Sequence, residues 1–330
     1  MAAPSDLVRE LVSGGALRDP AWRAAFEQVP RELFVPYFYV PARGGGYERL
    51  WRDDPDPERR RRWAEGVRSD RPLATRIRDG ELVSSSSQPS LMARMLEYLE
   101  LRDGMDVLEI GTGPGYNAAL LCHRLGDARV TTVDLDPEIT DAARAHLAAA
   151  GHRPHVLTTD GARGCPAHAP YDRIIATCAL PWLPPAWLAQ CAPDALVLAP
   201  VASGLLALRV PGGGPAGGRF KPTPAYFVPL RGGTPAPHPE PEPGPESGVP
   251  RAGQRDDTFR FLLTLSGGRL EPGEAHDLWR RAGRPGRERY GVSVRDGRQW
   301  AWLDDPEGPY TWPLGEPVPD GRGTADRSGA

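Results

Sequence analysis

The chain has 330 residues, a formal net charge of −3, and charged side chains at 25% of its positions. This length can hold one large domain or two smaller ones. A charge balance this close to neutral gives no general attraction to polyanions, so neither nucleic acid nor an anionic membrane is an expected partner.

The scattered cysteines and the apolar segments narrow the class further. No C-x-x-C pair occurs among Cys122, Cys165, Cys178 and Cys191, so we expect reduced thiols and no metal site. The longest apolar region, 195–210, is too short and too interrupted to span a bilayer. The first ten residues lack the apolar core of a secretory signal. These features predict a cytoplasmic protein.

The first eighty residues are predicted to be mostly helical. An amphipathic helix begins at Ser5 and ends at Gly14-Gly15, and a second runs from Pro20 to about Gln28. The charged stretch 43–71 is typical of a solvated insertion that carries one short helix.

A run of serines, Ser84, Ser85, Ser86 and Ser87, precedes Gln88-Pro89 and a periodic apolar segment over 91–99. Serine before a helix is first of all an N-cap within a loop. The alternative is a cluster of hydroxyl and amide groups at the mouth of a pocket, and the pattern alone leaves both open.

Strands and helices then alternate. Strands are predicted over 106–110, 130–134, 155–159 and 173–177, with helices over 117–125, 137–150 and 185–190. Strands over 196–200 and 205–210 fit a hairpin, and 226–230 fits one more strand. Such alternation predicts an α/β fold, a doubly wound parallel sheet that binds ligands at the carboxyl ends of its strands.

A glycine-rich turn, GTGPGY, follows the first of these strands and opens a helix. Gly111, Gly113 and Gly115 let the backbone approach a ligand closely. Asp134 comes about twenty residues later, where a carboxylate reaches ribose hydroxyls. Tyr116 stands where a dinucleotide fingerprint has its third glycine, which favours S-adenosylmethionine (SAM) over NAD.

The C-terminal part begins with a proline-rich and acidic stretch, 232–253, predicted to be an extended linker. Beyond it we expect a strand at 259–265, a helix at 271–283 and a hairpin over 289–305 that turns at Asp296-Gly297. The chain from about Gly315 is predicted to be disordered. The aromatic residues of this tail fit packing on the core or a platform for a substrate peptide; they are Trp300, Trp302, Tyr310 and Trp312.

Six segments in order resemble the protein-L-isoaspartate O-methyltransferase family. They are VPRELFVP (29–36), DRPLATRI (70–77), LEIGTGPGY (108–116), TTDGARG (158–164), PYDRIIATCA (170–179) and AYFVPL (225–230). The resemblance covers roughly 20–231. It implies a Rossmann-like SAM-dependent methyltransferase fold, with N-terminal helices and a small α+β C-terminal extension. It also implies a peptide or protein substrate and S-adenosylhomocysteine as the product.

The resemblance also implies the site residues. Ser87 matches the family's serine beside the reacting carboxylate. The residues expected around the cofactor are Glu109, Gly111, Thr112, Gly113, Gly115, Tyr116, Asp134, Leu135, Asp160 and Gly161. Those expected around the substrate are Ser84, Ser85, Ser86, Gln88, Thr177, Cys178 and Ala179.

The chain departs from the family pattern at an insertion between Tyr47 and Asp70, at the four serines and at the long tail. We therefore divide it into an N-terminal region with insertion (1–80), a SAM-binding core (81–231), a linker (232–253) and an extension that could read substrate (254–330).

The same departures resemble a branch that methylates an aspartate in modified ribosomal peptides of the lanthipeptide or graspetide type. The ester would then cyclise to a succinimide and open to isoaspartate. The alternatives are repair of isoaspartyl proteins and, in another class, a non-catalytic module that binds SAM and a peptide.

Overall fold

The computed structural model describes residues 6–232 and 248–315. Its centre is a ten-stranded sheet in the order β14-β13-β12-β11-β10-β9-β8-β5-β6-β7. Neighbours from β7 through β9 are parallel, and the pairs from β9 onward are antiparallel. The strands are β5 (Val107–Ile110), β6 (Val130–Asp134), β7 (His155–Thr158), β8 (Tyr171–Ala176), β9 (Cys191–Val201), β10 (Gly204–Val210), β11 (Ala216–Pro224), β12 (Tyr290–Arg295), β13 (Arg298–Leu303) and β14 (Thr311–Leu314).

Helices cover both faces of this sheet, so the side chains of a central strand alternate between two cores. On β8, Ile174 packs in one core and its neighbour Ile175 in the other. One face is covered by α1 (Asp6–Ser13), α2 (Pro20–Gln28), α4 (Pro89–Tyr98) and α5 (Tyr116–Leu125). The other is covered by α7 (Pro185–Ala189), α9 (Asp257–Leu265) and α10 (Pro272–Arg281). The predicted doubly wound, Rossmann-like α/β fold is confirmed, including α6 (Pro137–Ala149) and the hairpin β9–β10.

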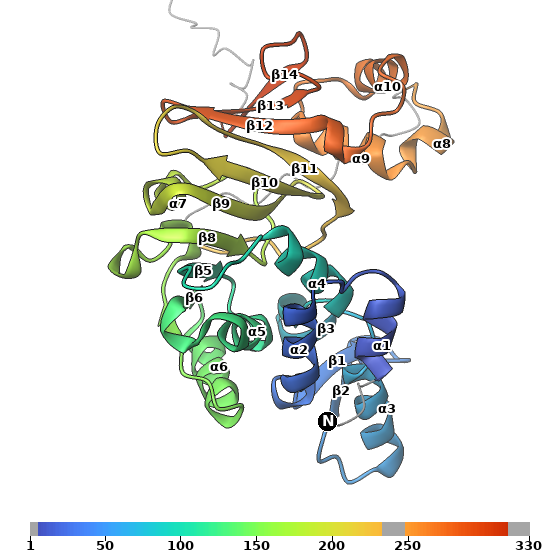
Figure 1. Ribbon diagram of the computed structural model, residues 1–330. Helices are drawn as coiled ribbons and strands as arrows, with labels where there is room; N and C mark the ends of the chain where they lie inside the picture. The colour runs from blue at the N-terminus through green and yellow to red at the C-terminus, as the bar shows by residue number, and fades with distance from the viewer. Residues whose placement is uncertain (1–5, 233–247, 316–330) are drawn as a thin grey trace, which may run out of the picture.

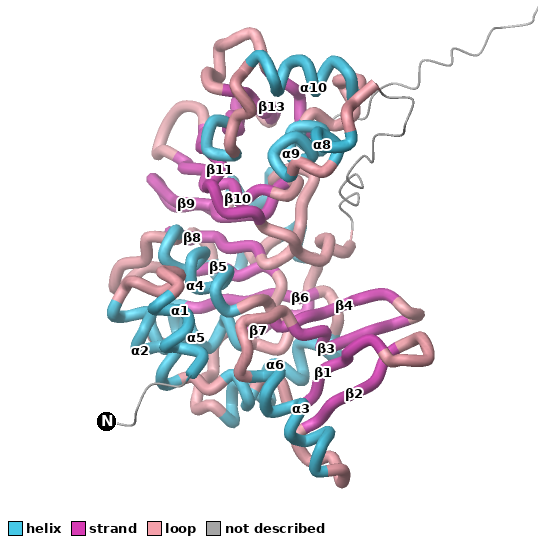
Figure 2. Tube along the Cα trace, turned by 90° about the vertical axis from the view of Figure 1, so that its right-hand side faces the viewer, coloured by secondary structure: helices cyan, strands magenta, loops and turns pink. Residues whose placement is uncertain are grey.

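The N-terminal region differs from the prediction of helices with a solvated insertion. It also holds a four-stranded antiparallel sheet in the order β2-β1-β3-β4. Its strands are β1 (Tyr37–Pro41), β2 (Tyr47–Trp51), β3 (Leu73–Arg78) and β4 (Glu81–Ser86), with α3 (Pro57–Val67) following β2. Phe38 is buried against Gly66 of α3, where an added Cβ would come within 2.4 Å of the ring. The insertion is therefore packed, because aromatic burial outweighs its charged composition. Figure 2 shows this small sheet beside the main one.

The segment predicted as a strand at 259–265 is helix α9. Asp256 caps it by accepting a hydrogen bond from the backbone N–H of Thr258 at 2.9 Å. The prediction failed because Phe259 and Phe261 stand two positions apart, a spacing typical of a strand, and both are fully buried. The predicted helix at 271–283 and the hairpin with its turn at Asp296-Gly297 are confirmed as α10 and β12–β13.

The extension does not form a separate α+β unit. Its strand β12 pairs with β11, with Ala216 opposite Val294, and so continues the main sheet. Figure 1 shows these strands, orange to red, extending the sheet away from the blue N-terminal segment. The predicted strand at 226–230 is a loop, in which Pro229 makes an isolated bridge to Ala179.

Most of the predicted linker and the tail beyond Gly315 lie outside the described residues, and α8 (Arg251–Gln254) occupies the linker's end. Among the helices described, none is long and apolar enough to cross a membrane.

Candidate active site

The glycine turn lies at the carboxyl end of β5 and leads directly into α5. Gly111 has a φ of +97°, and a Cβ added there would lie 2.7 Å from Thr177 Oγ1. Gly113 has a φ of +51°, with the Ser85 carbonyl oxygen 3.4 Å from an added Cβ. Both positions favour glycine because L side chains rarely adopt this conformation, and at Gly111 an added Cβ would also clash with Thr177.

Glu109 is fully buried beneath this turn. It accepts hydrogen bonds from Asn117 Nδ2 at 2.7 Å and from Thr132 Oγ1 at 2.6 Å. Burial raises the pKa of Glu109 to about 7, although both hydrogen bonds favour the charged form. Asn117 Oδ1 is buried and has no hydrogen-bond partner within the described part of the chain. These acceptors together suit a donor group on a ligand, since an unpaired buried acceptor is costly.

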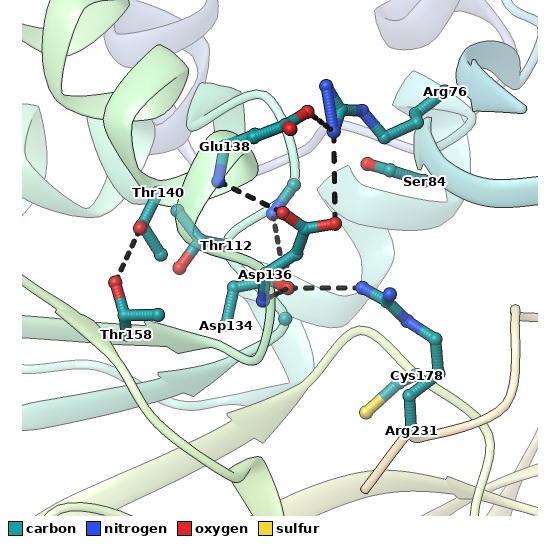
Figure 3. A network of polar contacts seen from close by, with 12 residues as sticks. Arg76, Ser84, Thr112, Asp134, Asp136, Glu138, Thr140, Thr158, Cys178 and Arg231 are labelled. Atoms are coloured by element: carbon teal, nitrogen blue, oxygen red, sulfur yellow. Dashed lines mark hydrogen bonds and ion pairs between the residues drawn. The ribbon is translucent and has the colours of Figure 1, made fainter. Parts of the chain in front are cut away.

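Asp134, at the end of β6, faces the glycine turn. Its carboxylate accepts a hydrogen bond from Gly113 N at 3.1 Å and is paired with Arg231 at 3.3 Å (Figure 3). Its side chain is 10% exposed, and burial raises its pKa despite these partners. An acceptor at this position suits ribose hydroxyls.

The hairpin β3–β4 closes over the start of α6. Arg78 donates to Asp136 at 2.8 Å, and Arg76 pairs with Asp136 and Glu138. These ion pairs hold the hairpin against the start of α6, as Figure 3 shows for Arg76.

Of the two interpretations of the serine run, the helix cap is wrong, because Ser84 to Ser86 belong to strand β4. The N-cap position of α4 is Gln88, which makes no side-chain capping bond. Asp70 replaces it, accepting hydrogen bonds from Ser90 N at 2.8 Å and from Gln88 Nε2 at 3.0 Å. A carboxylate eighteen or more residues away thus fixes the end of the serine run.

Arg31 holds the serine run from beneath. It is 2% exposed and donates to Ser86 Oγ at 3.0 Å and to the carbonyls of Ser86 and Ser87 at 3.0 and 3.1 Å. It also donates to the carbonyls of Ser69 and Arg71. Burial lowers the pKa of Arg31 to about 10. Sequence reasoning missed this residue, although the segment VPRELFVP that carries it was noticed.

Three cavities meet at this place. The cofactor cavity, about 70 Å³, lies between the glycine turn, Asp134 and the loop 228–231. A second cavity of about 30 Å³ adjoins Glu109 and Asn117. The acceptor groove, about 920 Å³, is lined by the small sheet, α4 and the loop 223–229. Ser85 lines all three, and Ser87 lines the last two.

Comparison with known proteins assigns this arrangement to a family. Residues 68–209 match the family model for protein-L-isoaspartate(D-aspartate) O-methyltransferase. A protein-L-isoaspartate O-methyltransferase of Thermococcus onnurineus is 37% identical over 198 residues, which are 59% of this chain and 76% of that protein. The chain belongs to the protein-L-isoaspartate O-methyltransferase family. It is a SAM-dependent methyltransferase.

Other members agree. A relative from Hyperthermus butylicus is 34% identical over 68% of this chain and 87% of its own length. One solved protein-L-isoaspartate O-methyltransferase shares the fold with a TM-score of 0.61 at 21% identity, covering 93% of this chain and 98% of that one. The Plasmodium falciparum structure, in complex with S-adenosyl-L-homocysteine, has a TM-score of 0.53 at 14% identity and covers 70% of this chain and 99% of that one. Since the first likeness takes in nearly the whole chain, the C-terminal strands are no peculiarity of this methyltransferase.

Most residues that sequence reasoning assigned to the methyltransferase site line these cavities. Leu135, Gly161, Thr177 and Cys178 line the cofactor cavity, and Thr112 and Tyr116 line the cavity beside Glu109. Burial raises the pKa of Cys178 far above its usual range, so its thiol stays uncharged and forms part of the cavity lining.

Three assigned residues line none of the three cavities. Asp160 instead accepts a hydrogen bond from Ala162 N at 2.9 Å, and Gly115 packs against α6. Ala179 pairs through its backbone with Val228 and Leu230.

One group of possible metal ligands occurs among the residues described. Cys122, Asp127 and His152 have ligand atoms within 4.8 Å of one another, at the amino ends of the strands, opposite the methyltransferase site. His152 Nδ1 lies 2.9 Å from Asp127 Oδ1, as in an ordinary hydrogen bond.

Proposed function

We propose that the protein transfers the methyl group of SAM to a carboxylate of an isoaspartyl residue in a peptide or protein. The observation that carries this proposal is the position of Ser85 and Ser87, which border both the region of the glycine turn and the acceptor groove. The names of the relatives support the isoaspartyl acceptor.

The residues present fit the cofactor. Asp134 would hold the ribose, and Glu109 with the unpaired Asn117 Oδ1 would hold the ammonium end. Gly111 and Gly113 would leave room for the chain between them. SAM supplies a methyl group on a positively charged sulfur.

The reaction needs no general acid or base from the protein. An acceptor carboxyl has a reference pKa near ~4, so it is already ionised at neutral pH and needs no general base. Ser87 would donate a hydrogen bond that orients this carboxylate, and the loop carrying Val228 and Leu230 would exclude water. We assign no nucleophile, because no group among the residues that the structure describes is placed to activate Ser87.

A second acceptor has one observation in its favour. Tyr47, where the chain begins to depart from the family pattern, lines the acceptor groove and is 48% exposed. The insertion would then select a particular substrate, such as an aspartyl side chain in a modified ribosomal peptide. In that peptide the backbone nitrogen of the following residue would attack the methyl ester and displace methanol, and water would open the resulting succinimide to aspartate or isoaspartate.

Two matched peptides that differ only in an isoaspartyl or aspartyl residue test the acceptor, with methyl ester formation followed by mass spectrometry. Methylation of the isoaspartyl peptide alone supports the first proposal, and methylation of the aspartyl peptide alone supports the second. If neither peptide is methylated, and precursor peptides tested beside them are not methylated either, both proposals are contradicted.

Ser87→Ala should lower kcat by about 10- to 100-fold, the range for losing a hydrogen bond to a charged group, and leave SAM affinity unchanged. Ser85→Ala is the comparison. If it produces that loss and Ser87→Ala does not, Ser85 orients the acceptor and the assignment by position before Gln88-Pro89 is wrong.

A further inference from the structure

The charged side chains that line the acceptor groove are all positive among the described residues. Its lining includes two arginines, Arg71 at the start of the small-sheet hairpin and Arg94 on α4, and no carboxylate among the described residues. The groove opens beside the serine run and shares Ser85 with the cofactor cavity. A bound chain therefore meets these two cations close to the acceptor position.

Neither arginine is neutralised within the described part of the chain. Arg71 Nε donates to Ser69 Oγ at 3.0 Å, and Arg94 makes no ion pair there. Two arginines near the groove are neutralised in this way, since Arg62 pairs with Glu48 and Arg78 with Asp136. Two unpaired cations on a concave surface attract a negatively charged partner.

The same groove gathers exposed apolar side chains. Of the six exposed large hydrophobic residues found among the described positions, Tyr47, Leu82 and Tyr226 line it, at 48%, 42% and 59% exposure. Exposed aromatic surface beside polar groups marks a site of macromolecular contact.

We propose that the groove binds an extended acidic peptide. Beside the acceptor carboxyl, this peptide carries at least one Asp or Glu that meets Arg94 or Arg71, and one aromatic or aliphatic side chain that meets Tyr47, Leu82 or Tyr226. The inference rests on the proposed peptide methylation and names the substrate class. From Gln88 to Arg94 the helix rises about 9 Å, and an extended peptide advances about 3.3 Å per residue. The acidic residue therefore lies within about three positions of the acceptor.

The test uses fluorescein-labelled peptides with one acceptor and one tyrosine, and with Glu, Gln or Lys three positions to either side. Binding to the full chain is followed by fluorescence anisotropy in the presence of S-adenosylhomocysteine, at low and high salt. We expect the Glu peptide to bind about tenfold more tightly than the Lys peptide, with the difference shrinking at ~1 M salt, where the Debye length is about 3 Å.

Arg94→Glu should reverse the order, so that the Lys peptide binds more tightly. Arg295→Glu makes the same charge change on the β12–β13 hairpin, away from the groove, and should leave the order intact. If Arg94→Glu does not fold, the exposed Arg71→Glu carries the same expectation.

Equal binding of all three peptides would overturn the inference. It would also be overturned if Arg295→Glu changed the order of binding as much as Arg94→Glu does. Methylation is scored separately by mass. Acidic preference in binding without methylation of any peptide would contradict the proposed function and leave the groove's specificity standing.

Discussion

The two sides of the active site are built differently. On the cofactor side, the glycine turn and the polar residues around it come from one stretch, 107–134, in which Gly113 contacts Asp134 21 residues away and Asn117 contacts Glu109 eight residues away. More distant segments, such as the loop 228–231, close the cavity. On the acceptor side, the serine run is held by Arg31, 55 residues earlier, and by Asp70.

The difference shows which physical feature each side depends on. A strand, a glycine turn and a helix form the cofactor side with backbone conformations that few residues besides glycine can adopt. The acceptor side depends instead on buried polar side chains that satisfy carbonyls from distant segments. Substitutions should therefore affect the two sides through different mechanisms.

The largest loss of stability is expected on the acceptor side. Arg31→Met leaves the carbonyls of Ser69, Arg71, Ser86 and Ser87 without their buried donor. We expect the free energy of unfolding to fall by about 4 kcal/mol, since each unmet acceptor costs roughly 1–3 kcal/mol and relaxation recovers part of it. Urea unfolding measures this.

The control is Arg23→Met, which removes an exposed pair with Glu27 on α2 and should cost under about 1 kcal/mol. Equal losses from the two variants would mean that the buried arginine does not hold the serine run.

The next effect concerns Glu109, in the cavity where the two sides meet. Its pKa is raised from 4.5 to about 7, so the folded state binds a proton that the unfolded state releases. This contribution is fully present below pH 4.5 and is lost as the pH rises through about 7, with a size of roughly 3 kcal/mol.

Between pH 4 and pH 8, the free energy of unfolding of the wild type should therefore fall relative to that of Glu109→Gln. The difference between the two proteins isolates this group from other titrating residues. Parallel curves would contradict the raised pKa.

The smallest stability effect is expected on the cofactor side. Gly111→Ala forces an L residue to a φ of +97° with its Cβ 2.7 Å from Thr177 Oγ1, and should cost about 2 kcal/mol. SAM binding, measured by calorimetry, should weaken as well, because Gly111 lines the cofactor cavity.

Gly126→Ala is the matched control, with a φ of +86° and nothing within 4 Å of its added Cβ. It should cost similar backbone strain and leave SAM affinity unchanged. If both variants bind SAM normally, the turn does not hold the cofactor.

Sequence reasoning succeeded where the signal is local and failed where partners are distant. Alternating strands and helices from Val107 onward predicted the parallel half of the sheet, and Gly111, Gly113 and Asp134 are drawn together there as expected. The serine run was ambiguous because a strand in this hairpin and a capped loop look alike until the partner β3 is known. Arg31 could not be assigned, because nothing near it in sequence shows that it lies under Ser86.

The sequence by itself determined the fold class, the glycine turn and the family resemblance, because these follow from periodicity and from backbone conformations set within a few residues. The tertiary structure alone decided that Phe259 lies in a helix, that β12 continues the main sheet, and that Arg71 and Arg94 face one groove. These outcomes depend on which distant surfaces are buried together, and burial is a property of the whole chain.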